Sequence, residues 1–201
     1  MEASARKGEE GLRERKRRET LQRISEVGLS LFLSKGYDAT TLEEIATEAG
    51  ISPRTFFYYF KSKDDIILAY VSGFNKEVRA SITERGPIGS PLNSVEKAMA
   101  AVADRFATPK LMSIVRLMRE SDALRTKNRN SSHLEDAIFE AICDAWPAKG
   151  RRDRLRLVAI ASMGAMRVAV DAWLAQSGKR PLSMYLRDAF SGLKTEMSES
   201  D

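Results

Sequence analysis

Apolar residues recur along this chain at spacings of three and four, the period of a helix that buries one face. In the first such stretch, residues 15–35, that face carries Leu21, Ile24, Val27, Leu31 and Phe32. The same period predicts further helices near 42–49, 53–59, 64–84, 93–107, 110–120, 133–146, 152–177 and 182–197. Glycines and prolines lie mainly between these stretches, so the chain is predicted to be all-α.

Two short helices near the N-terminus carry clear start and stop signals. Thr41, with Glu44 three places later, has the pattern of a capping box at a helix start. Gly50 then ends that helix, and Ser52 with Pro53 begins the next. Short helices joined by a tight turn that contains glycine are typical of a helix-turn-helix, whose second helix enters the DNA major groove.

The pattern divides the chain into three parts. Residues 1–19 have no apolar period and mix arginine and lysine with glutamate, so we expect a mobile basic arm, a candidate for the adjacent minor groove. Residues 20–66 are predicted to form the helix-turn-helix domain, and residues 67–201 a larger helical domain.

Composition adds three limits. The chain has 33 lysines and arginines against 28 aspartates and glutamates, a net charge of +5 that favours a nucleic-acid partner. A single cysteine, Cys143, rules out an internal disulfide framework and fits a reducing cytosol. No unbroken apolar run reaches the ~18 residues of a membrane span, so we expect a cytoplasmic protein without a membrane partner.

The second of the two short helices has the chemistry of a DNA-reading face. Phe56 and Phe60 are one turn apart and are predicted to face the core, whereas Arg54, Phe57 and Tyr58 point elsewhere. An arginine can bind guanine N7 and O6, aromatic rings can contact thymine methyl groups, and a tyrosine hydroxyl can bind phosphate.

At these residues the chain resembles the DNA-binding region of the TetR family of regulators. The resemblance covers residues 21–68 and rests on residues 36–41 (GYDATT), 45–46 (IA), 49–52 (AGIS), 55–60 (TFFYYF) and 63–64 (KD). It implies a non-enzymatic homodimer that binds palindromic operator DNA, most often as a repressor, and is switched by a small-molecule effector without a cofactor or metal. The repressor assignment stays open against activation.

The resemblance also implies roles for individual residues. Thr41 and Lys63 are expected at phosphates, and Phe57 and Tyr59 stand where the family usually has tyrosine and histidine. The DNA-contact candidates are Thr41, Ser52, Arg54, Thr55, Phe57, Tyr58, Tyr59 and Lys63. Thr41 and Ser52 are helix caps in any case, and Arg54 and Lys63 have the alternative of solvated surface residues.

In the family, the second half forms a ligand cavity and its last two helices form the dimer interface. The dimer candidates here are Leu155, Val158, Ser162, Met166, Leu186, Phe190 and Leu193. The ligand-contact candidates are Met99, Phe106, Met112, Val115, Arg116, Met118, Arg119, Met166 and Trp173. Arg116, Arg119 and Arg125 beside this apolar set suggest an effector with an acidic head group, such as a fatty-acyl compound. An ordinary internal core is the alternative for both sets.

Two other classes of protein remain to be weighed. The first is a helical ligand-binding or scaffolding protein whose helix-turn-helix is vestigial, although such a protein would not need exposed Arg54 and tyrosines on that helix. The second is an enzyme, which the sequence disfavours. His133 and Cys143 are its only histidine and cysteine, and no zinc-ligand cluster or glycine-rich phosphate loop is present.

Overall fold

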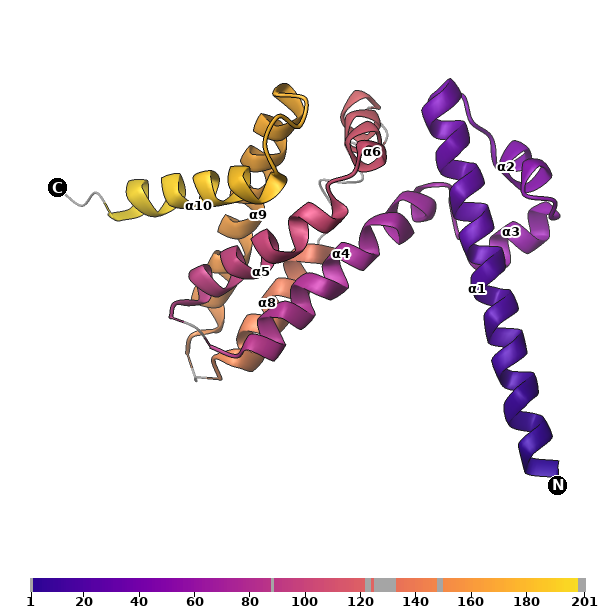
Figure 1. Cartoon of the computed structure of the whole chain (residues 1–201), viewed down its shortest axis with the longest axis horizontal. Helices are drawn as coiled ribbons and strands as arrows, with labels where there is room; N and C mark the ends of the chain where they lie inside the picture. The colour runs from indigo at the N-terminus through magenta and orange to yellow at the C-terminus, as the bar shows by residue number, and fades with distance from the viewer. Residues whose placement is uncertain (1, 88, 122–123, 125–132, 148–149, 199–201) are drawn as a thin grey trace. The chain divides into compact units, whose positions relative to one another are not determined.

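The computed structural model describes residues 2–87, 89–121, 124, 133–147 and 150–198, and for residues 2–10 it describes the backbone alone. Within this part of the chain every regular element is an α-helix, as predicted (Figure 1). The helices are α1 (Glu2–Lys35), α2 (Leu42–Glu48), α3 (Pro53–Tyr59), α4 (Asp64–Arg85), α5 (Pro91–Phe106), α6 (Pro109–Glu120), α8 (His133–Ala145), α9 (Arg152–Ala175) and α10 (Leu182–Ser198).

Helix α1 is the one element that differs clearly from the sequence-based expectation. It begins at Glu2 rather than near residue 15, so the segment expected to be a mobile arm is helical. The reason is that arginine, lysine, glutamate and alanine are good helix formers and need no apolar face. Arg15 and Glu19, one turn apart, also form an ion pair at 3.5 Å, the arrangement that supports exposed helices.

The chain folds into two compact units. The first takes Met1–Val71 together with Leu117–Arg125, and the second takes Ser72–Arg116 together with Thr126–Asp201. Helices α4 and α6 therefore each contribute residues to both units.

One side of α3 packs into the hydrophobic core of the first unit. Helix α1 packs against α2, and α2 packs against α3. The buried side chains of this unit include Ile24, Leu29, Phe32, Tyr37, Ile45, Ala46, Phe56, Phe60, Ile66 and Ile67. Each large apolar side chain buried in this way stabilises the fold by about 1.5–3 kcal/mol. Because Phe56 of α3 and Phe60, the C-cap of α3, are buried in this core, the other side of α3 is left for solvent or for a partner.

The second unit is a helical bundle centred on α9. Helix α9 packs against α5, α8 and α10, and α10 also packs against α5. Phe74 of α4 meets Phe106 of α5 edge to face, with ring centroids 5.6 Å apart. The carboxylate of Asp104 on α5 accepts hydrogen bonds from the backbone N–H of Ser183 at 2.9 Å and from its hydroxyl at 2.6 Å. A carboxylate at the positive end of a helix stabilises it, so Asp104 holds the start of α10 against α5.

Candidate DNA-binding surface and ligand cavity

The turn between α2 and α3 has the backbone geometry of a helix-turn-helix. Thr41 caps α2 in a full capping box with Glu44, as predicted. At the other end, the N–H of Ile51 donates to the carbonyl of Ala46 at 2.9 Å. Gly50 has φ +65°, a left-handed conformation that glycine adopts without strain. The chain therefore turns within four residues and presents α3 beside α2.

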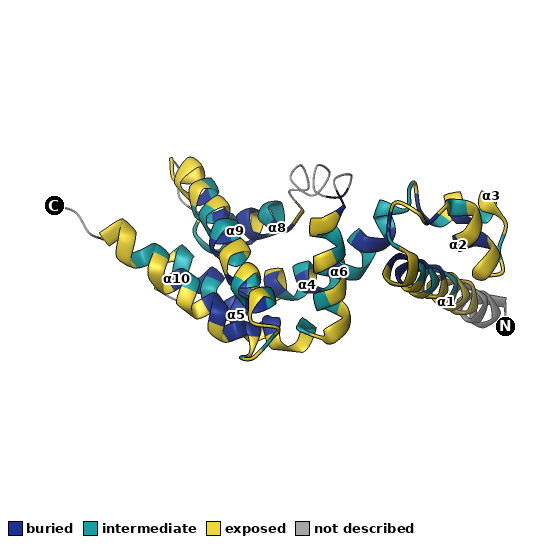
Figure 2. Ribbon diagram, turned by 90° about the horizontal axis from the view of Figure 1, so that it is seen from above, coloured by how far each residue is buried: buried dark blue, intermediate teal, exposed yellow. Residues whose placement is uncertain are grey.

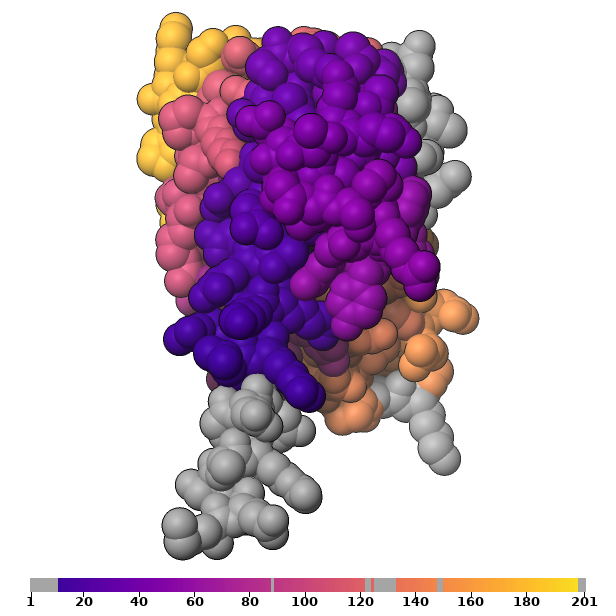
Figure 3. Space-filling model, turned by 90° about the vertical axis from the view of Figure 1, so that its right-hand side faces the viewer, coloured from indigo at the N-terminus to yellow at the C-terminus, as the bar shows by residue number. Residues whose placement is uncertain are grey.

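Helix α3 separates its residues into a buried side and an exposed side. Its N-cap Ser52 accepts a hydrogen bond from the N–H of Thr55 at 3.1 Å. Phe56 is fully buried, whereas Phe57 and Tyr58 are 54% and 72% exposed. Figure 3 shows the face of the first unit, on which α1, α2 and α3 lie at the surface. Two large aromatic side chains in water cost solvation free energy, so this face is suited to contact with a partner.

The remaining residues of α3 add hydrogen-bonding groups to the exposed side. Arg54 is exposed, and within the described part of the chain its guanidinium has no ion pair. Tyr59 is half-buried and meets Tyr58 edge to face, with ring centroids 5.1 Å apart. The helix thus offers the guanidinium of Arg54 together with the aromatic edges and hydroxyl groups of its tyrosines, the set that reads base edges and phosphates.

Lys63 lies where the chain enters α4, and its side chain is directed into the protein. Its ammonium donates to the carbonyl oxygens of Tyr37 at 2.7 Å and of Thr40 at 2.9 Å. The hydroxyl of Tyr37 in turn donates to the carboxylate of Asp64. These contacts hold the loop between α1 and α2 against the start of α4. The sequence assigned Lys63 to phosphate binding, and the structure adds this internal role, which sequence reasoning missed.

The side-chain carboxyl group of Glu44 has a strongly lowered pKa. Its carboxylate accepts hydrogen bonds from Lys35 and from the backbone N–H of Thr41, and these lower its pKa from 4.5 to about 2. Glu44 therefore stays negatively charged over the whole physiological range. It lies in the first turn of α2, where a negative charge is favourable.

The second unit contains a cavity of about 620 Å³. The cavity lies at the C-terminal end of α5, the start of α6 and the turn between α9 and α10. Its lining includes Asp104, Met112, Trp173, Gly178, Lys179 and Arg180. Sequence reasoning missed Gly178, Lys179 and Arg180, because residues 178–181 carried only the signal of a turn. It also missed Asp104, a polar residue of the predicted helix 93–107 that has no distinguishing motif around it.

The residues predicted to contact the ligand lie in different places: in the cavity wall, in the buried core and on the surface of α6. Met112 and Trp173 line the cavity. Met99 is fully buried in the core of the second unit, and half-buried Phe106 and Met166 pack against that core. Val115 and Met118 are half-buried on α6, and Arg116 and Arg119 are exposed there. Arg125 lies outside the described residues.

The predicted dimer contacts lie mostly inside the second unit. Leu155, Ser162, Leu186 and Phe190 are buried in its core, and Val158, Met166 and Leu193 are half-buried at the edge of that core. Other apolar side chains of α9 are exposed: Leu157, Ile160 and Val168 are 64%, 48% and 61% exposed. Buried and exposed positions thus alternate along α9 (Figure 2). The spacing of 157, 160, 164 and 168 was the available signal for this second face.

Helix α9 is also long and apolar enough, by length and composition alone, to cross a membrane. One such helix is weak evidence of a membrane span, and Leu155, Ala159, Ala169 and Trp173 of α9 belong to the buried core of the second unit.

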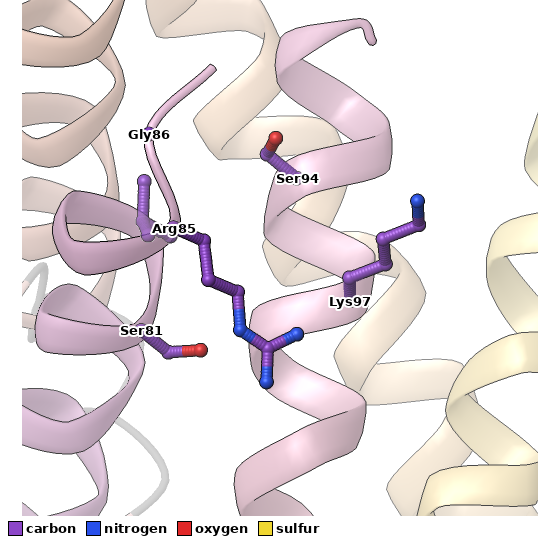
Figure 4. Close-up of a pocket in the computed structure, with 6 residues that line it drawn as sticks. Ser81, Arg85, Gly86, Ser94 and Lys97 are labelled. Atoms are coloured by element: carbon purple, nitrogen blue, oxygen red, sulfur yellow. The ribbon is translucent and has the colours of Figure 1, made fainter. Parts of the chain in front are cut away.

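A narrow crevice lies between the end of α4 and the start of α5 in the second unit. Figure 4 shows Arg85 of α4 extending toward α5, with Ser81 on α4 and Ser94 and Lys97 on α5 beside it. The crevice has a free volume of about 0 Å³, so it leaves no room for a ligand. Among the described residues no group of three or more histidine, cysteine, aspartate or glutamate side chains could hold a metal ion.

Two family models match this chain and together span most of it. Residues 24–70 match the bacterial regulatory proteins of the tetR family, and residues 89–198, more than half of the chain, match the MftR C-terminal domain. The chain belongs to the TetR family. The first match contains all of α2 and α3, so the helix-turn-helix described above is the DNA-binding motif of this family.

A curated relative extends the similarity over nearly the full length. The TetR-family chain is 29% identical over 199 residues to the HTH-type transcriptional regulator TcmR of Streptomyces glaucescens, covering 93% of this chain and 88% of TcmR. The relatives are transcriptional regulators, and this protein is accordingly a DNA-binding transcriptional regulator rather than an enzyme.

Solved structures share the fold at low sequence identity. NalD of Pseudomonas aeruginosa, a repressor of a multidrug efflux pump, superimposes with a TM-score of 0.63 at 16% identity, covering 89% of this chain and 96% of NalD. FadR of Thermus thermophilus, solved in complex with lauroyl-CoA, gives a TM-score of 0.55 at 22% identity, covering 90% and 96% of the two chains.

Proposed function

We propose that this TetR-family protein is a cytoplasmic homodimeric repressor that binds a palindromic operator through α3 and is released by a small organic effector. The observation that carries the DNA-reading role is the division of α3. Phe56 anchors one side in the core, while Arg54, Phe57 and Tyr58 stand exposed on the other. Because the buried side of α3 is fixed in the core, the helix can place a guanidinium and aromatic edges in a DNA groove with little further loss of conformational entropy.

We assign the DNA contacts as follows. Arg54 reads a base edge, with Ser52 and Thr55 at the groove-facing start of α3. Phe57 contacts apolar groups, because a phenyl ring cannot donate the hydrogen bond of the tyrosine usual at this place. Tyr58 and Tyr59 bind phosphate through their hydroxyls, and Thr41 binds phosphate at the start of α2. For Lys63 we favour the internal role, since two of its N–H groups already reach carbonyl oxygens.

Dimerisation is assigned to the exposed face of α9. Leu157, Ile160 and Val168 form an apolar row there. A Cβ atom added to Gly164 would meet nothing within 4 Å in its own chain, so a second helix has room to approach closely at this point. A dimer would hold two copies of α3 about 34–36 Å apart, the spacing of successive major grooves.

The effector role is supported by the cavity and by a relative. FadR of Thermus thermophilus is named as a complex with lauroyl-CoA, and for this chain we propose a fatty-acyl compound or a similar small organic molecule. Helices α4 and α6 contribute residues to both units, so a ligand-driven shift in the second unit has a covalent route to the first. Release requires that the effector bind the DNA-free form better than the DNA-bound form.

The test of DNA reading is the selection of bound duplexes from a random library, read by sequencing. We expect the natural protein to enrich a two-fold palindrome and Arg54→Ala to lose preference at one base of each half-site, weakening binding by about 1–3 kcal/mol. Arg187→Ala, which removes an exposed arginine of α10, is the matched control and should enrich the same palindrome. Absence of any enriched palindrome would favour a scaffold with a vestigial helix-turn-helix.

A further inference from the structure

The 620 Å³ cavity of the second unit has the size of a small-molecule site, since such sites measure about 300–1,000 Å³. Its walls come from three separate parts of the sequence: the end of α5, the start of α6 and residues 177–182 with Trp173. The cavity combines apolar surface with charged groups. Whether each polar group already has a hydrogen-bond or ion-pair partner indicates what the cavity would bind.

The indole of Trp173 brings an unpaired donor to this cavity. Trp173 is only 4% exposed, yet among the described residues its N–H has no hydrogen-bond acceptor. No fully buried side-chain nitrogen or oxygen in the same part of the chain lacks a partner, so this N–H keeps contact with open space. Trp173 lines the cavity, and its indole nitrogen lies beside Gly178, another lining residue, because a Cβ atom added at Gly178 would be 3.4 Å from that nitrogen. A ligand acceptor there would satisfy a donor that the protein leaves unpaired.

The turn after α9 packs beside this donor. Ser177 and Gly178 have φ +51° and +69°, and the N–H of Gly178 donates to the carbonyl of Trp173 at 2.9 Å. A Cβ atom added at Gly178 would lie 2.9 Å from the terminal methyl of Met112 and 3.4 Å from the indole nitrogen of Trp173. Any side chain at Gly178 would therefore crowd Met112 and the indole nitrogen, and non-glycine residues in a left-handed conformation, such as Ser177, are concentrated at functional sites.

The charged groups of the cavity leave one positive charge uncommitted. The carboxylate of Asp104 is held by Ser183 through two hydrogen bonds. Arg180 pairs with Asp188 at 2.8 Å and stacks on the ring of Tyr185. Lys179 is exposed, and within the described residues its ammonium has no ion pair. An anion entering the cavity would find this free ammonium.

We propose that this cavity binds a small organic anion with an apolar body, whose negatively charged oxygens accept hydrogen bonds from the Trp173 indole and the Lys179 ammonium. Met112 and the indole ring contact the apolar body, and the flexible thioether of Met112 adapts to its shape. The regulatory meaning of this site rests on the proposed function, whereas the binding itself does not.

The test uses tryptophan fluorescence of the full-length protein carrying Trp146→Phe, because Trp146 and Trp173 are its two tryptophans. Dodecanoate supplies a carboxylate on an apolar chain, 8-anilinonaphthalene-1-sulfonate supplies a sulfonate on aromatic rings, and 1-dodecanol is the uncharged comparison. We expect both anions to change the Trp173 emission saturably and dodecanol to bind at least tenfold more weakly. Equal binding of dodecanol and dodecanoate would overturn the requirement for an anion.

Single substitutions test whether the anion binds in this cavity. We expect Lys179→Gln to weaken dodecanoate binding about tenfold, the effect of losing a charge-assisted hydrogen bond. Lys97→Gln, at the crevice that has no room for a ligand, is the matched control and should bind normally. Trp173→Phe keeps the ring and removes the donor, so calorimetry should show about fivefold weaker binding. Normal affinity in both Lys179→Gln and Trp173→Phe, or no saturable binding at all, would overturn the site.

The outcome for this site can be separated from the outcome for the proposed function. A protein that selects a palindrome but binds neither anion retains its DNA-reading role and loses the site. A protein that binds the anions through Lys179 and Trp173 but keeps its operator equally well with and without them has the site, and the proposed coupling to DNA release is then wrong.

Discussion

The ammonium group of Lys63 lies over the ring of Tyr37, 4.2 Å from the ring centroid, and donates a 2.7 Å hydrogen bond to the Tyr37 carbonyl oxygen. Tyr37 follows α1 and Lys63 precedes α4, so this pair joins two segments that flank the helix-turn-helix. The contact is half-buried, where an ammonium loses some hydration and its hydrogen bonds to carbonyl oxygens replace it.

Lys63→Gln is expected to lower the free energy of unfolding by about 1–3 kcal/mol, because hydrogen bonds from a charged group to the backbone are lost. Urea unfolding measures this change, with Lys61→Gln, an exposed neighbour, as the control. We also expect the slope of log K for DNA binding against log salt to stay unchanged. A slope smaller by about 0.9 with normal stability would instead assign Lys63 to a phosphate.

The stability of the first unit should depend on pH through Glu44. Its pKa is about 2 in the folded protein and 4.5 as the ordinary value, because Lys35 and the N–H of Thr41 favour the carboxylate. The stabilisation from this carboxylate is therefore complete above pH 4.5 and is lost as the pH falls toward 2. We expect Glu44→Gln to unfold at lower urea concentration than the natural protein at pH 7, and the difference to shrink between pH 4.5 and pH 2. A difference that is constant with pH would contradict this account.

Gly28 and Ile66 provide a test of close packing between α1 and α4. A Cβ atom at position 28 would lie 2.6 Å from the Cδ1 atom of Ile66, which is fully buried. Gly28→Ala is therefore expected to destabilise the protein by about 1–3 kcal/mol. Adding Ile66→Val removes Cδ1 and should recover part of that loss, which a double-mutant cycle measures.

Gly11→Ala is the control for this substitution within α1. A Cβ atom there would meet nothing within 4 Å. We expect it to stabilise the helix by about 0.5–1 kcal/mol through the better helix propensity of alanine. Equal effects of the two substitutions would show that the contact with Ile66 carries no energy.

If the exposed face of α9 is the dimer interface, a charged residue on that face should convert the dimer into a folded monomer. Val168→Glu places a charge on the exposed apolar face of α9, where Val168 touches solvent in the single chain. Light scattering should report a monomer whose helical circular dichroism is unchanged, because burying an unpaired carboxylate between two chains is costly. Leu12→Glu, at an exposed leucine of α1, should remain a dimer. A Val168→Glu dimer of normal stability would place the interface elsewhere.

Much of the helix-turn-helix could be predicted because its signals are local. Thr41 with Glu44, Gly50, and Ser52 with Pro53 act on backbone groups within four residues of themselves. The observed helices accordingly begin and end within about two residues of the predicted limits, apart from the start of α1. That start was missed because a charged helix without an apolar face has no periodic signal.

The regions proposed for effector binding and dimerisation were predicted less specifically, because a helical period of apolar residues does not determine which surface packs against them. The period of α9 is equally consistent with an internal core and with an interface. Leu155 and Ser162 prove to be internal, and Leu157 and Val168 prove to be exposed.

The sequence by itself determined the order and type of the helices and the helix-turn-helix, since these follow from the period of apolar residues and from caps acting over one turn. Membership of a DNA-binding family came instead from the resemblance of residues 21–68 to the TetR family. Only the tertiary structure decided that Lys63 reaches Tyr37 and that the start of α6 lines the same cavity as Trp173 and Lys179. Such contacts join residues tens of positions apart, and their partners are chosen by how the helices pack rather than by any residue's neighbours in the chain.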